Sequence, residues 1–226
     1  ISNPNHPFSR FKTGNLESLK NTTPKELRTW YNEHYSSDKM KLVIMSSLAL
    51  EELVEMVSEK FNKVPRRFIP EVELPKNLLS LENAGKIVIS EPIRESRSLN
   101  LSWELPSNFA KELNFQPGSI AAFILGHEGS SSLLSQLKKE GLAESLSAGE
   151  YILGHQYPIF SITVELTEKG LEEYQEVIKR SFQAINHFKN EPTPIHILKE
   201  IKQMGTLDYQ YQQRKEVFGQ MMSLSR

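Results

Sequence analysis

Six histidines are the residues of this sequence best suited to acid–base or metal chemistry: His6, His34, His127, His155, His187 and His196. A hydrolytic zinc site needs two histidines on neighbouring helical turns, so that both reach one ion, and a glutamate that activates water. Neither H-E-x-x-H nor H-x-x-E-H occurs in the sequence. The histidines alone therefore predict no catalytic metal site.

The nearest approach to such a site is the segment from Trp30 to His34, which has the spacing of the inverted motif. Trp30 stands at the place of the first ligand, and an indole cannot coordinate zinc. We interpret the segment as the end of a helix, where His34 lies near the C-terminal dipole that favours cations.

Two pairs of a histidine and a glutamate fit both a functional and a structural interpretation. His196 and Glu200 are four residues apart on one helix face, which fits either two metal ligands or a solvated polar face; two ligands are too few for a site. His127 and Glu128 lie in Gly126–Ser130 and fit an acid–base dyad. The other interpretation is a turn between two helices, in which the glycines serve backbone geometry. The sequence predicts no catalytic residue and no metal ligand.

The composition is typical of a soluble globular protein. Of 226 residues, 38% are hydrophobic and 24% charged, and 27 basic residues balance 28 acidic ones to a net charge of −1. Without a long run of one sign, nucleic acid and membrane surfaces are not expected partners. No apolar run approaches the roughly 20 residues that span a bilayer. The absence of cysteine excludes disulfides, thiolate metal sites and cysteine nucleophiles.

The first part of the chain has the pattern of a helix, a strand and a second helix. Thr23 is the expected N-cap of the first helix, with Pro24 at its first position and Glu26 completing a capping box. Lys41–Ser46 predicts a short buried strand, and apolar residues from Leu50 to Phe61 recur at helical spacing. The chain begins without Met or a signal-like apolar core, so we expect it to be part of a larger protein.

Three prolines, Pro65, Pro70 and Pro75, mark residues 64–84 as a linker. It divides the chain into residues 1–63, which resemble the end of a domain, and a second domain at residues 85–226.

The second domain is predicted to alternate pairs of strands and helices. Its expected elements, in order, are strands 86–90 and 98–105, helices 117–125 and 131–139, strands 143–151 and 159–166, a long helix capped by Thr167, and a last helix from Pro194. Leu99, Leu101 and Trp103 share one face of their strand. This order indicates an α+β fold, an antiparallel sheet covered by helices on one face.

Four segments resemble the insulinase/pitrilysin family of zinc metallopeptidases, in the family's own order. They are residues 3–17 (H-P-F-x-x-F-x-T-G-N), 35–40 (Y-S-S-N-x-M), 126–138 (G-H-E-G followed by S-L-L-x-x-L-K) and 166–170 (L-T-E-x-G). The resemblance implies that the chain spans the end of the family's first domain and most or all of its second.

It further implies a parent protein that is a zinc metalloendopeptidase, with its zinc site upstream of Ile1. The segment itself is then expected to bind no zinc and to be inactive alone. Its expected partners are a peptide substrate and the rest of the peptidase chain. A non-catalytic peptidase-like scaffold or partner subunit is the alternative. Family members work in the bacterial periplasm or in the cytoplasm, so the compartment stays open.

The resemblance also implies a substrate-holding edge that binds the peptide's N-terminal end by strand addition. The matching residues are Gly126, Glu128, Leu146, Ser147, Ala148, Gly149 and Glu150. Gly126 would leave room for a backbone, and Glu128 would meet an ammonium group. Gly126→Val is expected to block the groove and leave the fold near native. The family reads L-V-G-G-Q where this strand has Leu146–Glu150, and a merely protected sheet edge is the other interpretation.

Overall fold

The computed structural model describes residues 2–11, 13–111, 117–154, 156–213 and 216–225. Lys12 of the first matched segment and His155 lie outside the described residues. The chain forms two compact units, one of residues 1–9 and 75–211 and one of residues 10–74 and 212–226. The domain boundaries predicted from the sequence remain a prediction. None of the helices in the described ranges is long and apolar enough to cross a membrane.

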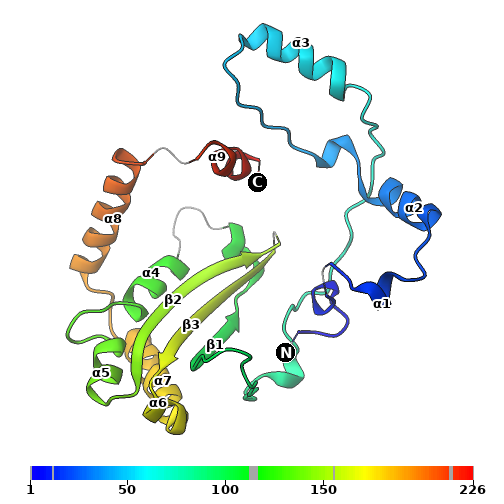
Figure 1. The fold of residues 1–226 in the computed structure, drawn as a ribbon. Coiled ribbons are helices and arrows are strands. Elements are labelled where there is room, and N and C mark those ends of the chain that lie inside the picture. The colour runs from blue at the N-terminus through cyan, green and yellow to red at the C-terminus, as the bar shows by residue number, and fades with distance from the viewer. Residues whose placement is uncertain (1, 12, 112–116, 155, 214–215, 226) are drawn as a thin grey trace. The chain divides into compact units, whose positions relative to one another are not determined.

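A three-stranded antiparallel sheet is the centre of the larger unit (Figure 1). Its strands are β1 (Ser98–Glu104), β2 (Ala143–Leu153) and β3 (Tyr157–Leu166). Their order is β1-β3-β2, so β3 is central and pairs with both neighbours. As a result β2 is an edge strand.

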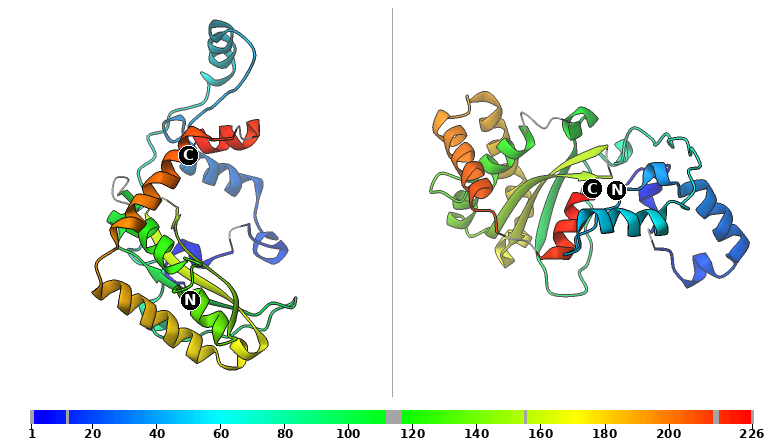
Figure 2. Two further views of the ribbon diagram at one scale, coloured as in Figure 1. Left: turned by 90° about the vertical axis from the view of Figure 1, so that its left-hand side faces the viewer. Right: turned by 90° about the horizontal axis from the view of Figure 1, so that it is seen from above.

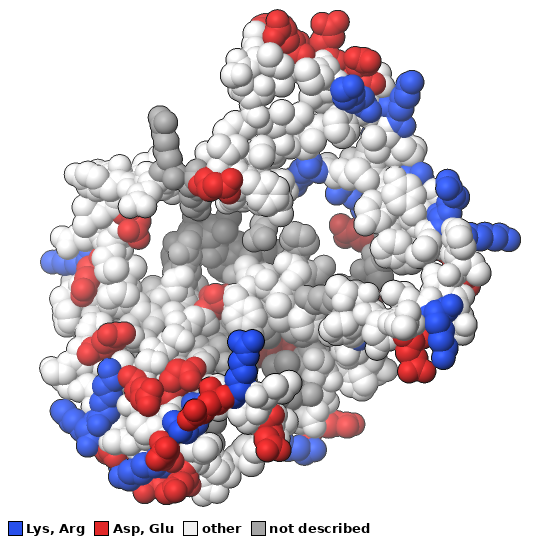
Figure 3. Space-filling model, in the orientation of Figure 1, with Lys and Arg blue, Asp and Glu red and all other residues white. Residues whose placement is uncertain are grey.

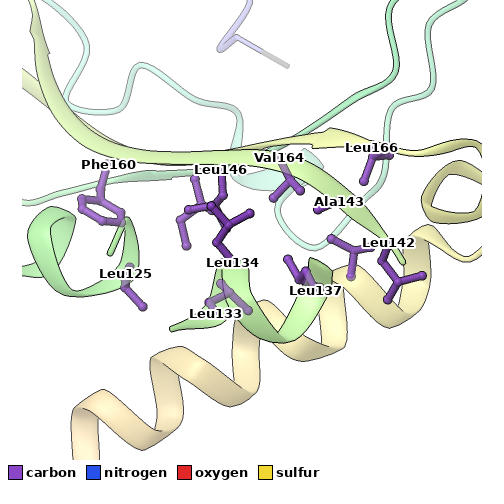
Figure 4. Close-up of a cluster of buried hydrophobic side chains, with 12 residues drawn as sticks. Leu125, Leu133, Leu134, Leu137, Leu142, Ala143, Leu146, Phe160, Val164 and Leu166 are labelled. Atoms are coloured by element: carbon purple, nitrogen blue, oxygen red, sulfur yellow. The ribbon is translucent and has the colours of Figure 1, made fainter. Parts of the chain in front are cut away.

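Five α-helices complete this unit: α4 (Pro117–Leu125), α5 (Leu133–Lys139), α6 (Glu168–Glu172), α7 (Tyr174–Asn190) and α8 (Ile195–Gln210). Figure 2 shows α4, α5 and α7 on one side of the sheet. In Figure 4 the core lies between the sheet and these helices, with Leu146 and Val164 directed toward α5 and Phe160 toward Leu125 at the end of α4. The predicted α+β class is therefore confirmed.

The other face of the sheet carries polar side chains in its middle. Asn100 donates to Thr163 across β1 and β3 (2.8 Å), and the hydroxyls of Ser102 and Ser161 are 3.0 Å apart. Leu99, Leu101 and Trp103 pack against the core, as their alternation predicts. The described α-helices of this unit that pack on the core thus lie on one face of the sheet.

The junction between β3 and α6 explains the L-T-E-x-G segment. The Thr167 hydroxyl accepts from the Gly170 backbone N–H (2.9 Å) and donates to the Gly141 carbonyl (2.7 Å). A Cβ on Gly170 would overlap the carbonyl oxygen of Leu142. The predicted single helix after Thr167 is wrong, because Glu173, at φ −104° and ψ 31°, interrupts the helical geometry between α6 and α7.

A small second core fastens the N-terminal segment to this unit. Its buried residues are Leu78, Tyr157 and Ile159. His6 is only 4% exposed; its Nδ1 accepts from the Phe8 backbone N–H (3.1 Å) and its ring meets Tyr157 edge-on. The H-P-F segment therefore has a structural role in this unit.

The smaller unit contains α1 (Leu16–Leu19), α2 (Pro24–His34), α3 (Leu50–Phe61) and α9 (Val217–Leu224). The capping box predicted for α2 is confirmed: Thr23 Oγ1 accepts from the Glu26 N–H (3.3 Å), and the Glu26 carboxylate accepts from the Thr23 N–H (2.7 Å). The helix around Leu50 is confirmed as α3.

Two predicted strands, Lys41–Ser46 and Lys86–Ser90, are not strands in the structure. Their apolar residues are exposed, Leu42 by 51% and Ile89 by 80%. A run of apolar residues specifies a strand only where a neighbouring strand accepts its hydrogen bonds. Among the described residues, no strand pairs with either segment.

Candidate functional site

The free edge of β2 is defined by the register of the sheet. Leu105 N–H donates to Pro158 O (2.8 Å) and Leu166 N–H to Arg97 O (2.6 Å), so the even-numbered residues of β3 face β1. Successive residues of a strand direct their N–H and C=O to opposite sides. The odd-numbered residues of β3 therefore face β2, and pair there with Ser147 and Gly149.

It follows that the backbone groups of Leu146, Ala148 and Glu150 point to the open side of β2. Within the described part of the chain, these groups form no hydrogen bond with another segment. Unpaired N–H and C=O groups in a row are the template to which a further extended chain adds. Three of the five predicted strand residues thus have backbone groups free for this purpose.

The end of α4 lies against this edge. A Cβ built on Gly126 would stand 3.3 Å from the Ala148 nitrogen and 2.8 Å from the Ala122 carbonyl oxygen. Both neighbours are backbone atoms, which cannot move aside as a side chain can. The expectation that Gly126→Val would leave the fold near native is therefore wrong: the side chain would disturb the contact between α4 and β2.

Glu150 uses its side chain within the fold. Its carboxylate lies at Gly118, where a Cβ would overlap it. Gly118 is in the first turn of α4, and the N-terminal end of a helix favours an anion. Only the backbone of Glu150 is presented at the edge, while its carboxylate is directed toward α4.

The turn after α4 places Glu128 and His127 differently. The Nδ1 atom of His127 accepts from the Gly129 N–H (2.9 Å), and its ring lies 5.9 Å from that of Phe123. Glu128 is exposed and forms no hydrogen bond or ion pair with the described residues. His127 therefore serves the turn, as one of the two sequence interpretations has it, and Glu128 is open to a ligand.

The same turn borders a cavity of about 530 Å³ between the ends of four helices. The cavity brings His127 together with His187, His196, Glu191 and Glu200. Sequence reasoning paired His196 with Glu200 but missed the other members, because they meet only through the packing of α4, α7 and α8. In the described ranges, no three His, Asp or Glu side chains are placed to hold a metal ion.

The segment with inverted-motif spacing is a helix end in the structure. His34 lies in the last turn of α2, where its Nδ1 is 2.8 Å from the Trp30 carbonyl oxygen. Its ring stacks on the indole of Trp30 at 4.4 Å. Trp30 and His34 therefore do not form a pair of zinc ligands.

The face of the molecule seen in Figure 3 shows no patch of one charge over α5, α6 and α7 that would indicate a second binding site. Over α5, α6 and α7, acidic and basic side chains are intermixed. Glu140 and Arg180 form an ion pair on these helices, with 3.0 Å between Oε1 of Glu140 and Nη2 of Arg180. The hydrogen bond from Arg180, and then that from Gln136, holds the pKa of Glu140 below its ordinary value. The pair connects the end of α5 to α7, so its role is structural.

Comparison with known proteins places this arrangement in a family. The family model for the "Peptidase M16 inactive domain" matches residues 21–204. The A-factor-processing enzyme of Saccharomyces cerevisiae is 30% identical over 100% of this chain and 23% of its own length. Human insulin-degrading enzyme is 29% identical over 96% of this chain and 22% of its own length. The chain thus spans less than a quarter of these relatives.

Solved structures agree with the family model. The crystal structure of pitrilysin matches 99% of this chain and 24% of its own, with a TM-score of 0.89 and 25% identity. A peptidase M16 inactive domain from Pseudomonas fluorescens has the same fold, with a TM-score of 0.55 and 18% identity. The predicted insulinase/pitrilysin resemblance is confirmed. The chain belongs to the peptidase M16 family, and the region it covers is the one described as the family's inactive domain.

Proposed function

We propose that this chain is the substrate-holding segment of a zinc metalloendopeptidase. It binds an extended peptide along β2 and holds the peptide's N-terminal end near Gly126 and Glu128. The zinc ion and the residues that activate water belong to sequence upstream of Ile1. The segment contributes binding and orientation and performs no chemical step itself.

One observation carries the proposal: the backbone groups of Leu146, Ala148 and Glu150 lie on the open side of an edge strand, beside a residue without a side chain. Main-chain pairing gives affinity without requiring a particular peptide sequence. The exposed hydroxyls of Ser102 and Ser147 on the outer face of the sheet would keep such a complex solvated on that side.

Glu128 supplies the expected contact with the peptide's amino terminus. Its carboxylate has no partner among the described residues, so an ammonium group would not have to displace one. A charge-assisted hydrogen bond is stronger than a neutral one. It would favour a free N-terminus over a blocked one and so orient the peptide along the strand.

The rest of the peptidase chain is the proposed partner of the smaller unit. Leu27 and Trp30 on α2 and the apolar segment at Leu42 are each exposed by more than half. Exposed apolar surface on this scale marks an interaction site. The relatives are about four times as long as this chain, so we assign this surface to sequence beyond the segment.

The alternative is a non-catalytic peptidase-like scaffold or partner subunit. The name of one relative, the putative zinc protease mug138 of Schizosaccharomyces pombe, favours the enzyme; it is 30% identical over 96% of this chain. One experiment distinguishes the enzyme from the scaffold. A chain extended upstream to include H-x-x-E-H cleaves short peptides with zinc if the parent is an enzyme, and does not if it is a scaffold.

The holding role itself is tested with peptides whose own backbone is altered. N-methylation of alternate residues removes the donors needed for strand addition and leaves the side chains in place. We expect one N-methylated register to bind the chain on the order of 10-fold more weakly in fluorescence anisotropy. For peptides without arginine, a scrambled sequence of the same composition should bind as well as the original. Equal binding of both N-methylated registers and the parent peptide would contradict strand addition.

A further inference from the structure

The cavity next to the α4–α5 turn has the chemistry of a cation pocket. Its walls are the end of α4, the turn to α5, the end of α7 and the start of α8, and its volume is about 530 Å³. Pockets that hold small groups have volumes of this order. The apolar part of its lining includes Leu125, Leu133, Ala184, Phe188 and Ile197.

The formal charges at this cavity are of one sign. Glu191 and Glu200 line it, and no lysine or arginine is among the described residues that do. Neither carboxylate forms an ion pair or a side-chain hydrogen bond with the described residues. The nearby Lys199 and Lys202 border a different, shallow hollow formed by α8 alone. An occupant with a positive charge would therefore complement the cavity.

The aromatic groups of the lining narrow the choice of cation. Phe188 and the imidazoles of His127, His187 and His196 provide flat rings. A planar guanidinium stacks on such rings and donates to carboxylates in a fork, and its alkyl stem packs on apolar walls. An ammonium group is a compact, strongly hydrated charge and uses these rings less well.

We propose that this cavity binds an arginine side chain of the peptide held on β2. The proposal rests on the holding role and extends it by naming a substrate feature. The connection is the turn itself: Gly126 abuts the Ala148 nitrogen at the open edge, and the next residue, His127, already lines the cavity. A peptide that passes this point brings its side chains to the mouth of the cavity.

The first experiment uses a probe that does not depend on β2. N-acetylarginine amide is titrated into the full chain, and the histidine ring signals are followed by NMR. We expect millimolar binding, with the signals of His187 and His196 moving, and at least about 5-fold weaker binding of the neutral isostere N-acetylcitrulline amide. The double substitution Glu191→Gln and Glu200→Gln should remove this preference. Equal affinities of the two probes, or a preference that survives the substitutions, would overturn the proposal.

The second experiment separates the cavity from the edge. Two extended peptides that differ by one arginine or citrulline are compared by anisotropy. The Glu191→Gln/Glu200→Gln chain should lose the preference for arginine and keep its affinity for the citrulline peptide. Ala184→Phe, which fills the cavity, should do the same if the double variant folds poorly. If the parent chain binds both peptides equally, the arginine pocket is refuted and the holding role stands. If neither peptide binds, the holding role is refuted. The titration with N-acetylarginine amide then decides whether the pocket exists.

Discussion

Gly126 and Ala148 meet with no side chain between them: a Cβ on Gly126 would stand 3.3 Å from the Ala148 nitrogen. This nitrogen is one of the backbone groups on the open side of β2. The glycine therefore does two things, since it allows α4 to pack closely on β2 and leaves an edge N–H uncovered.

Gly126→Val should destabilise the larger unit, because its side chain would press on the backbone at Ala122 and Ala148. Overpacking of this kind costs about 1–3 kcal/mol. Gly149→Ala is the control, since a Cβ there meets nothing within 4 Å. Urea unfolding followed by circular dichroism should show a loss for the first variant and a change within about 0.5 kcal/mol for the second. Equal stabilities would mean that α4 does not pack on β2 as described.

Gly170→Ala should be at least as damaging, because the new methyl group would overlap the Leu142 carbonyl oxygen. That carbonyl also accepts from the Thr167 N–H (3.2 Å), so it has little freedom to move. We expect a loss of about 2–3 kcal/mol. Gly205→Ala on α8, where a Cβ meets nothing within 4 Å, should be neutral or stabilising by up to about 1 kcal/mol. A Gly170→Ala chain as stable as the parent would refute the role assigned to the L-T-E-x-G segment.

The Glu140–Arg180 pair should contribute to stability in a pH-dependent way. Because the pKa of folded Glu140 is lowered, first by the hydrogen bond from Arg180, its contribution is present at neutral pH. It is lost as the pH falls through the lowered pKa, below the ordinary glutamate range. Glu140→Gln should reduce the melting temperature by about 1–3 °C at pH 7, and the difference should shrink as the pH falls below the ordinary glutamate range. Glu176→Gln, which removes a more exposed pair with Lys179, should change the melting temperature less, and an equal effect would argue against the assignment.

Glu128 should discriminate between free and blocked peptide N-termini. For an exposed carboxylate without a partner, we expect a preference of about 2–5-fold for the free amine over the N-acetyl peptide. Glu128→Gln should bring this ratio to about one without changing the melting temperature. Glu144→Gln changes an exposed carboxylate at the irregular start of β2, and should keep the ratio. If both variants keep it, the amino terminus is not held by Glu128.

Sequence reasoning located most of the larger unit because its signals are local. Thr167 marks the start of a helix, and the alternation of Leu99, Leu101 and Trp103 assigns a strand face. It failed at Lys41–Ser46 and Lys86–Ser90, since a strand exists only with a partner and none of the described residues supplies one. Two further features could not be predicted from the sequence, because both arise from helix packing. They are the direction of the Glu150 side chain toward Gly118 and the position of His187 and His196 near the α4–α5 turn.

Pairing at the open edge of β2 is tested most directly by Ala148→Pro. This substitution removes an N–H on the open side and none of the hydrogen bonds to β3, and proline is tolerated on edge strands. Ile152→Pro is the matched control. The backbone N–H of Ile152 also points to the open side of β2, but Ile152 lies outside the segment assigned to the peptide. The proline ring takes up space beside Gly126, so some loss of stability is expected. We predict that Ala148→Pro weakens peptide binding about 10-fold when measured on chain that circular dichroism shows to be folded, while Ile152→Pro binds like the parent. Unchanged affinity in a folded Ala148→Pro chain would contradict the account.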